Sequence, residues 1–525
     1  MKKYNYVGWC MAGSLGLSAM SGQAAQPEKK QPHIILIMTD QQRWDALGCA
    51  GNEAVISPNV DRLAADGHLF CNAYTAAPSS TPARAGMLTG MSPWHHGLLG
   101  YGQVAEHYPY EMPQMLKDLG YHTLGIGKMH WHPQNVLHGF EATILDESGR
   151  VESPYFMSDY RKWFNTQAFG LNPDSTGVEW NAHGAKAYAL PERLHPTVWT
   201  GDRAVEAIKG YSSERPLFLK VSFARPHSPY DPPRRIVDKY EGRKIPAPVV
   251  GDWCKDLAID THPEKNPEAA VGNYGVEYAR NSRKYYYASV TFIDEQVGRI
   301  VDELKKKGMY DNALICFVAD HGDMLGDHHL WRKTYAYEGS AAIPFIIKLP
   351  ENMKSSLKPG EKIEAPVELR DLLPTFLALN GCRIPEEIDG LSLLPLLEKG
   401  KAPWREYIDI EHSTAYWADN YWCALTDGKI KYIWFFRTGE EQLFDLSKDP
   451  YELHDLSKAK ASGKTLEKMR KAMAGHLQER GEEWVKDGKL VIRNKNLLYS
   501  PNYPTNMGHR TKRFFQWSGK MGERF

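Results

Sequence analysis

The stretch from Ser80 to Arg84 reads Ser-Thr-Pro-Ala-Arg and places a hydroxyl, a proline and a guanidinium close together. A proline two positions after Ser80 is typical of the first turn of a helix, where backbone N–H groups and the helix dipole favour a negative charge. Arg84 falls one turn later on the same face, so it can stabilise an oxyanion or neutralise metal-binding carboxylates. The pattern predicts an anion site, although a serine at such a position can also be a plain helix cap.

Two further polar clusters directly follow apolar runs of the sequence. They are Thr39-Asp40-Gln41-Gln42 and Asp320-His321-Gly322-Asp323. Carboxylate and amide oxygens are ligands suited to Ca²⁺ or Mg²⁺, and a histidine among them is also compatible with Mn²⁺. A single aspartate after a strand is often a helix cap, but two such pairs favour one divalent metal site built from Asp40, Gln41, Asp320 and His321.

The strands and helices that must position these residues can be predicted from the pattern of apolar and polar residues along the chain. Continuous apolar runs at His33–Asp40, Pro216–Phe223 and Ala313–Asp320 are typical of parallel strands buried on both faces. Further strands are expected around His68–Thr75 and Tyr121–Gly127. Helices are expected at Pro58–Ala65, at Met112–Leu119, and where apolar residues recur at helical spacing from Val290 to Leu304.

Strands that alternate with helices predict an α/β fold, with a large, mostly parallel sheet sandwiched by helices. In such sheets ligands bind beyond the carboxyl ends of the strands, which is where the polar clusters fall. After about residue 400 the runs become shorter, at Tyr407–Glu411, Trp422–Leu425 and Lys429–Phe436, before one helix near Lys464–Glu479. This change predicts a catalytic domain over residues 30–400 and a C-terminal subdomain over 401–525, an antiparallel sheet with a packed helix.

The amino terminus and the overall charge limit where the chain works and what it binds. The basic start Met1-Lys2-Lys3, a weakly apolar run and small residues ending at Ala25 predict a signal peptide over residues 1–25, hence a periplasmic or secreted protein. No later apolar stretch reaches the roughly 18 residues needed to span a bilayer, so no stable membrane insertion is expected. Lys plus Arg equals Asp plus Glu at 64 each. This balance provides no overall field for nucleic acid, so an anion must be held by local charge.

The segment Ser80-x-Pro-x-Arg84, followed by Leu88-Thr89-Gly90, resembles the signature of the sulfatase family, formylglycine-dependent enzymes of the alkaline-phosphatase-like superfamily. The resemblance implies an alkaline-phosphatase-like fold and a serine-type enzyme in which Ser80 is oxidised to formylglycine. It also implies a radical S-adenosylmethionine maturation enzyme that works without oxygen. The working nucleophile would be the hydrated aldehyde, beside one divalent cation, for which Ca²⁺ is preferred and Mg²⁺ or Mn²⁺ remain compatible.

Four further residues match the family pattern: Lys128, His130, His227 and Lys333. By this resemblance, Lys128 and Lys333 hold sulfate oxygens as point charges. His227 protonates the leaving alcohol, and His130 assists the later elimination. Gln442–Leu446 and Asp449–Glu452 are similar to a segment of the family's C-terminal subdomain, which we interpret as a turn between a strand and a helix.

The expected activity is hydrolysis of sulfate monoesters, on sulfated carbohydrates and on aryl sulfates. Trp94-His95-His96 and His328-His329-Leu330-Trp331 offer donors and stacking faces for a sugar, but they can equally be core. Two alternatives remain. The metal pairs Asp-Gln and Asp-His depart from the family's Asp-Asp and Asp-Asn and resemble those of phosphonate monoester and phosphodiester hydrolases. The chain could also be a secreted glycan-binding protein in which Ser80 stays unconverted.

Overall fold

The computed structural model describes residues 31–147 and 156–504, so the signal peptide expected over residues 1–25 lies outside the described part. The described chain from Pro32 onward belongs to one compact unit. The domain boundary expected at residue 400 falls in the connection between helix α11 (Leu394–Lys399) and strand β10 (Ile408–His412). The boundary itself stays a prediction.

The main sheet has seven strands in the order β2-β8-β7-β1-β6-β4-β5. The pairs from β7 through β1, β6 and β4 to β5 are parallel, whereas β8 pairs antiparallel with both β7 and β2. This arrangement confirms the predicted mixed, mostly parallel sheet. The strands are β1 His33–Asp40, β2 His68–Leu69, β4 His122–Gly127, β5 Ala142–Leu145, β6 Leu217–Pro226, β7 Ala313–Ala319 and β8 Phe345–Lys348.

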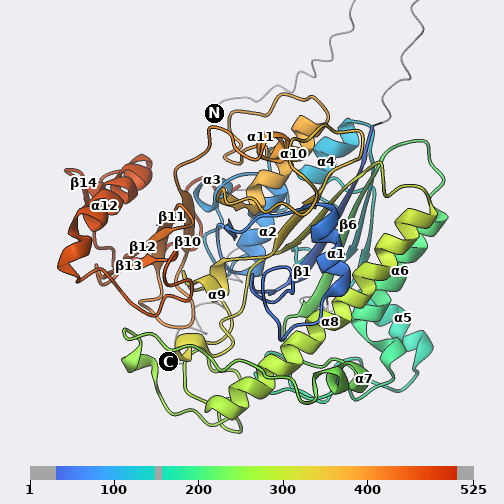
Figure 1. Ribbon diagram of the computed structural model, residues 1–525, viewed down its shortest axis with the longest axis horizontal. Helices are drawn as coiled ribbons and strands as arrows, with labels where there is room; N and C mark the ends of the chain where they lie inside the picture. The colour runs from blue at the N-terminus through green and yellow to red at the C-terminus, as the bar shows by residue number, and fades with distance from the viewer. Residues whose placement is uncertain (1–30, 148–155, 505–525) are drawn as a thin grey trace, which may run out of the picture. The chain divides into compact units, whose positions relative to one another are not determined.

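Helices cover both faces of this sheet because its central strands are apolar on both sides. Along β1, Ile35 and Ile37 pack with helices of one face, whereas Ile34, Leu36 and Met38 pack with helices of the other. Figure 1 shows the two layers on either side of β1 and β6. The first layer contains α1 Pro58–Asp66, α6 Pro196–Gly210 and α8 Val276–Lys306, and the second contains α2 Ser80–Thr89, α4 Met112–Asp118 and α10 Leu372–Leu379.

Two expected elements differ from the structure. The strand expected over His68–Thr75 is divided into β2 and a separate β3 (Ala73–Tyr74), which pairs with β9 (Val367–Glu368) outside the main sheet. The chain bends between β2 and β3, so one apolar run contributes a strand to each of two separate sheets. Helix α8 begins at Val276, well before the aliphatic spacing that starts at Val290. Its first half is buried through Tyr285, Tyr286 and Tyr287, a run without helical periodicity.

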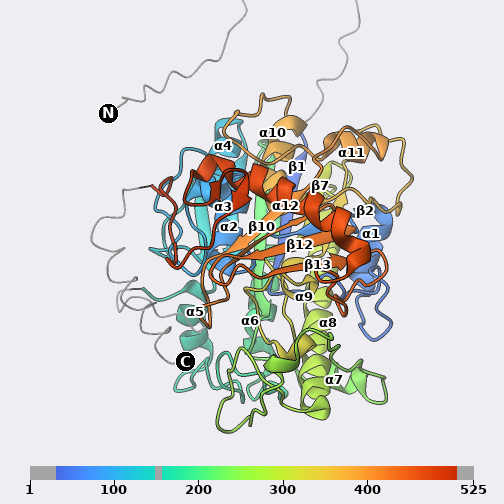
Figure 2. The same ribbon diagram turned by 90° about the vertical axis from the view of Figure 1, so that its left-hand side faces the viewer.

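The C-terminal part forms a four-stranded antiparallel sheet, as expected, with helix α12 (Gly463–Leu477) packed on one face (Figure 2). Its other face packs against residues of the main fold that include Tyr74 and Tyr335. Of the segment interpreted as a turn, Gln442–Asp445 lies in the edge strand β13, where Leu443 pairs with Tyr432, and Asp449–Glu452 lies in the turn after it. The strands are β10, β11 Trp422–Thr426, β12 Ile430–Phe435 and β13 Glu441–Asp445.

The last described residues return to the main fold near helix α3 (Pro93–His96). Ser500 Oγ donates a hydrogen bond to the Trp94 carbonyl at 2.6 Å, and Asn502 Nδ2 donates to the same oxygen at 3.1 Å. Tyr503 OH donates to the Gln103 carbonyl at 2.8 Å. Within the described residues, no helix has the length and apolarity needed to cross a bilayer. The short elements are α5 Asp159–Gln167, α7 Arg234–Val237, α9 Glu338–Ala341, β14 Val485–Lys486 and β15 Lys489–Leu490.

Candidate active site

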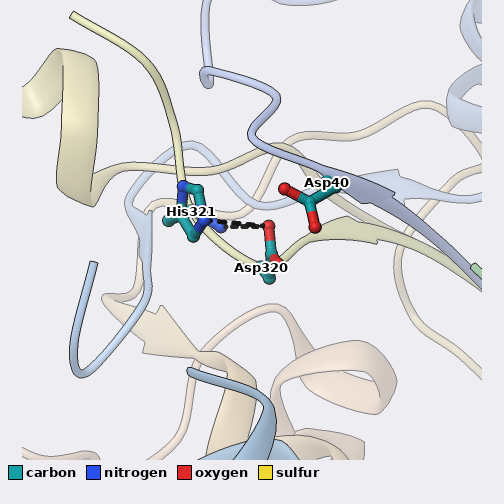
Figure 3. Close-up of side chains that lie close together, drawn as sticks. All are labelled: Asp40, Asp320 and His321. Carbon is teal, nitrogen blue, oxygen red and sulfur yellow. Dashed lines mark hydrogen bonds and ion pairs between the residues drawn. The ribbon is translucent and has the colours of Figure 1, made fainter. Parts of the chain in front are cut away.

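The neighbouring parallel strands β1 and β7 bring three potential metal ligands together at their carboxyl ends. Asp40 is the last residue of β1, and Asp320 and His321 follow β7. Each of the three side chains offers one ligand atom, and these atoms lie within 4.8 Å of one another (Figure 3). The backbone N–H of Asp320 donates to the Thr39 carbonyl at 3.2 Å, which holds the two strand ends side by side.

The donor atoms in this place fit a divalent cation. Among the described residues, neither Asp40 Oδ1 nor Gln41 Oε1 has a hydrogen-bond partner, although both atoms are buried. Burying a carboxylate oxygen without a partner is costly unless a ligand compensates it. Gln41 Nε2 donates to Asp323 Oδ2 at 2.5 Å, so the amide oxygen remains available to a metal. Gln41 also adopts a φ of 65°, a left-handed conformation that non-glycine residues reach only at some cost.

His321 has the protonation state that a metal ligand requires. Its Nδ1 donates to the Gly322 carbonyl at 2.9 Å, which leaves Nε2 unprotonated and able to accept. Burial lowers the pKa of the imidazole to about 4, although Asp320 acts in the opposite direction. His321 is therefore neutral at neutral pH and can bind a cation through Nε2.

Ser80 lies directly beside these ligands as the first residue of helix α2, and only 1% of its surface is exposed. Its Oγ lies 3.1 Å from His321 Nε2 and donates to Asp40 Oδ2 at 3.5 Å. Lys333 Nζ approaches the same Oγ at 3.4 Å. The first N–H groups of a helix have no acceptor within the helix, so they add to the positive potential around Ser80.

Arg84 connects the metal ligands to the rest of the sheet. Its Nε donates to Asp320 Oδ2 at 3.0 Å and its Nη2 to Asp40 Oδ2 at 3.2 Å, while Nη1 donates to the Lys128 carbonyl at 2.7 Å. Burial lowers the pKa of Arg84, but Asp320 and Asp40 outweigh it and raise the pKa above its usual value. Of the two roles open to Arg84, the contacts favour neutralising the carboxylates.

The charges of the site leave it positive overall. Lys128 Nζ forms an ion pair with Asp40 Oδ2. Burial raises the pKa of Asp40, but nearby cationic groups, led by Lys128, reverse this effect and hold the pKa well below its usual value. Three cationic side chains, Arg84, Lys128 and Lys333, therefore face two carboxylates, so the site suits an anion even before a metal adds its charge.

The two remaining predicted histidines lie on loops that follow strands. His227 follows β6, its N–H donates to the Asp40 carbonyl at 3.1 Å, and its Nδ1 donates to the Ser228 carbonyl at 2.8 Å. Its Nε2 is thereby left for a substrate. His130 lies on the loop after β4, where its N–H and that of Met129 donate to Glu147 Oε1 at 3.0 and 2.9 Å. Glu147 thus holds the loop that carries Lys128 and His130.

Sequence reasoning assigned no role to several residues that shape the site. Asp323 orients Gln41 and accepts from Tyr230 OH at 2.8 Å. Its position in the Asp320–Asp323 run was the one available signal. His412 on β10 accepts from Ser79 Oγ at 2.8 Å, next to Ser80. Nothing in the sequence around His412 indicates this contact, because 333 positions separate the two residues.

A hydroxyl at a helix N-terminus, set among hard metal ligands and excess positive charge, is suited to metal-assisted cleavage of an anionic ester. Together with a mostly parallel sheet between helical layers, it defines an ester hydrolase of the alkaline-phosphatase-like class. A sequence profile described as Sulfatase matches residues 32–382, more than half of the chain, so the chain belongs to the sulfatase family. A second profile, described as N-sulphoglucosamine sulphohydrolase, C-terminal, matches residues 326–479.

Individual relatives agree with this assignment. The chain is 37% identical over 474 residues to an arylsulfatase of Clostridium perfringens, covering 88% of this chain and 97% of the relative. It is 32% identical over 450 residues to a choline-sulfatase of Rhizobium meliloti, covering 81% and 82%. The solved phosphonate monoester hydrolase of Agrobacterium radiobacter shares the fold, with a TM-score of 0.72, 23% identity and coverage of 88% and 100%. The chain is thus a sulfuric ester hydrolase.

Proposed function

We propose that the chain removes sulfate from sulfated carbohydrates, using a formylglycine derived from Ser80 and a bound divalent cation, and releases inorganic sulfate. The main support for this proposal is the set of atoms that surround Ser80 Oγ. Its neighbours are His321 Nε2 at 3.1 Å, Lys333 Nζ at 3.4 Å and Asp40 Oδ2 at 3.5 Å. The potential nucleophile therefore lies within 3.5 Å of potential metal ligands and of a cationic group that can bind an anion.

The cation would be held by Asp40, Gln41, Asp320 and His321. Three of these four residues offer oxygen, a ligand set that favours Ca²⁺, while the imidazole keeps Mg²⁺ and Mn²⁺ compatible. When bound, it would stabilise negative charge on a sulfate oxygen and acidify a hydroxyl of the hydrated formylglycine. Arg84 contributes indirectly, because it fixes Asp40 and Asp320 in place.

The chain's own cationic groups would bind and orient the sulfate. Lys333, which reaches Ser80, and Lys128, which pairs with Asp40, would neutralise the oxygens of the ester as negative charge moves toward the leaving group. His227 is assigned the proton donation to the leaving oxygen, and His130 the assistance of sulfate release. Burial lowers the pKa of His227 well below its usual range, with Lys333 adding to the effect. A bound sulfate ester opposes this shift, because its negative charge favours the imidazolium form.

The carbohydrate part of the proposal has separate support. The profile that matches residues 326–479 is named after an N-sulphoglucosamine sulphohydrolase, whose name describes a sulfated sugar as the substrate. Aromatic residues are placed beside the site as well, since Trp180 stacks on His227 with ring centroids 6.0 Å apart. Small aryl sulfates are expected to be turned over in addition. A screen of defined sulfated monosaccharides for released sulfate tests this part, and turnover of aryl sulfates alone would contradict it.

Conversion of Ser80 is tested by the mass of the peptide that contains it. Oxidation to formylglycine removes two hydrogen atoms, and we expect the loss in protein made in its native host or with a radical S-adenosylmethionine maturation enzyme under anaerobic conditions. An unmodified peptide in fully active protein would overturn the nucleophile assignment. An unmodified peptide in inactive native protein would instead favour the glycan-binding alternative. Export to the periplasm or medium, which we also propose, is checked by fractionation and by the amino-terminal sequence of the mature protein.

A phosphonate monoester or phosphodiester hydrolase is the second candidate. Gln41 and His321 at the proposed metal site favour it, and a phosphonate monoester hydrolase shares the fold. Matched aryl sulfate and aryl phosphonate esters with the same leaving group separate the candidates. We expect the larger kcat/KM on the sulfate, and a strong preference for the phosphonate would replace our first choice.

A further inference from the structure

Five half-buried side chains near the catalytic groups are named the rim here: Tyr101, Trp180, Asn181, Arg332 and Tyr416. Trp180 stacks on His227, the residue assigned to protonate the leaving group. Tyr101 packs edge to face against His412 with centroids 5.6 Å apart, and His412 accepts the hydrogen bond of Ser79, next to Ser80. The rim therefore contacts the site at two places.

Contacts within the rim join these two places. The hydroxyls of Tyr101 and Tyr416 lie 2.7 Å apart, and the Arg332 guanidinium lies 6.0 Å from the centre of the Tyr416 ring. Arg332 Nη2 donates to the Asn181 carbonyl at 3.4 Å, and Asn181 follows Trp180. Ser80, His227 and Lys333 are buried, whereas the rim residues keep intermediate exposure. A substrate with its sulfate at Ser80 can therefore extend its leaving group toward the rim.

Arg332 carries the one charge of the rim, and this charge is weakly matched. The guanidinium contacts the Asn181 carbonyl at 3.4 Å and Glu268 Oε2 at 3.5 Å, both long for charge-assisted hydrogen bonds. Its other side-chain partner, Tyr416, is neutral, so Glu268 is the carboxylate it contacts among the described residues. Glu268 is 48% exposed, so solvent screens much of its attraction. The backbone φ of Arg332 is 67°, and the chain there directs Lys333 to Ser80 and Arg332 to the rim.

We propose that Arg332 binds a second anionic group of the substrate, a carboxylate or another sulfate carried by the leaving sugar. The inference rests on the proposed function and narrows its substrates to sulfated sugar acids or multiply sulfated sugars. A guanidinium presents paired N–H donors that match the two oxygens of either anion. The rings of Trp180, Tyr101 and Tyr416 offer faces and hydroxyls to the sugar ring between the two anions.

The test compares three sugars that carry the same sulfate ester. One is neutral elsewhere, one has its primary alcohol oxidised to a carboxylate, and one bears a second sulfate. We expect kcat/KM of the unaltered enzyme to be at least about tenfold higher on one of the anionic sugars than on the neutral one, which identifies the anion. Arg332→Met should reduce this preference by about tenfold or more, mainly through KM.

Two control variants sharpen the result. Arg383→Met removes an arginine whose side chain is 85% exposed and should keep the preference. Glu268→Gln removes the competing carboxylate and should increase the preference, which gives a second measurement if Arg332→Met does not fold. Equal kcat/KM on the three sugars, or equal losses on all of them in Arg332→Met, would overturn the role of Arg332 while leaving sulfate hydrolysis intact. An enzyme that cleaves aryl sulfates but none of the sugars contradicts both the inference and the carbohydrate proposal.

Discussion

Two buried charge clusters of this molecule differ in whether their charges are balanced from within. In the active-site cluster, Asp40 Oδ1 has no partner within the described residues, and cationic groups outnumber carboxylates. The second, which we name the Lys431 cluster, places Lys431 Nζ against Glu338, Glu452 Oε1 at 2.9 Å and the Ala336 carbonyl at 2.9 Å. That ammonium is therefore balanced by two carboxylates and a carbonyl of its own cluster.

This difference indicates different tasks for two equally buried clusters. The active-site cluster keeps unused acceptors and excess positive charge, which a cation and an anionic ester can take up. The Lys431 cluster joins strand β12 to helix α9 and to the turn after β13, so it attaches the C-terminal sheet to the main fold. Substitutions in the first cluster should mainly change activity, and substitutions in the second should mainly change stability.

Ser80→Ala should give the largest effect on activity. Loss of the nucleophile should reduce kcat by about 10⁴-fold or more, measured as sulfate release from an aryl ester. The free energy of unfolding should change by less than about 1 kcal/mol, because a small buried side chain loses only one hydroxyl. Ser79→Ala, the same deletion one residue earlier, serves as the control and should keep most of the turnover. Substantial activity in Ser80→Ala would refute the nucleophile assignment.

Lys431→Met should show the opposite behaviour. The substitution leaves Glu338 and Glu452 buried without their cation, so we expect a loss of about 3–5 kcal/mol in the free energy of unfolding. Denaturant unfolding measures this loss. The kcat of the remaining folded enzyme should stay within about twofold of the original, since distant sites act independently. A stable Lys431→Met enzyme with a low kcat would break the distinction between the clusters.

His227→Ala sharpens the comparison from the active-site side. A general acid matters most for poor leaving groups, so kcat on a sugar sulfate should fall by about 10²–10⁴-fold. On a nitrophenyl sulfate, whose leaving group needs little protonation, the loss should be roughly tenfold. Turnover of the two esters by both proteins checks this prediction. Equal losses on the two would remove the general-acid role.

The smallest predicted effect is the pH dependence of the Lys431 cluster. Burial raises the pKa of Glu452 to about 7 from an ordinary 4.5, although Lys431 opposes the shift. Because the folded state binds this proton more tightly, its contribution to stability is complete below pH 4.5 and is lost as the pH rises through about 7. Glu452→Gln should remove roughly 3 kcal/mol of this dependence, measured by unfolding across that range. An unchanged pH profile would show that Glu452 does not titrate there.

Local patterns explain why much of the fold could be predicted. Strand β1 covers His33–Asp40 as expected, because one uninterrupted apolar run ends in polar residues. Helix α2 begins at Ser80, as Pro82 indicated. The early start of α8 could not be predicted from the sequence, because three consecutive buried tyrosines interrupt the helical spacing of apolar residues. Periodicity describes one face of an element, and it fails where an element is buried on several faces.

The candidate site was predictable where residues follow a buried strand or match a family motif. The assembly of Asp40, Ser80 and Asp320 was expected from strand ends and a motif, and the structure places the three side chains together. Arg84 could stabilise an oxyanion or neutralise metal-binding carboxylates, and choosing between these roles required the positions of Asp40 and Asp320. Arg332 and His412 were not predicted, because their partners lie in distant segments and a single arginine or histidine has no distinguishing pattern.

The return of the last described residues to helix α3 bears on the order in which the contacts of the molecule can form. Ser500 and Asn502 bond the Trp94 carbonyl across sequence separations of 406 and 408 residues. Synthesis proceeds from the amino terminus, so this carbonyl must wait for almost the whole chain before its partners exist. Contacts of such long range form late and slow the search for the native state. The contacts that tie residues 500–503 to helix α3 are therefore among the last that can form as the molecule folds.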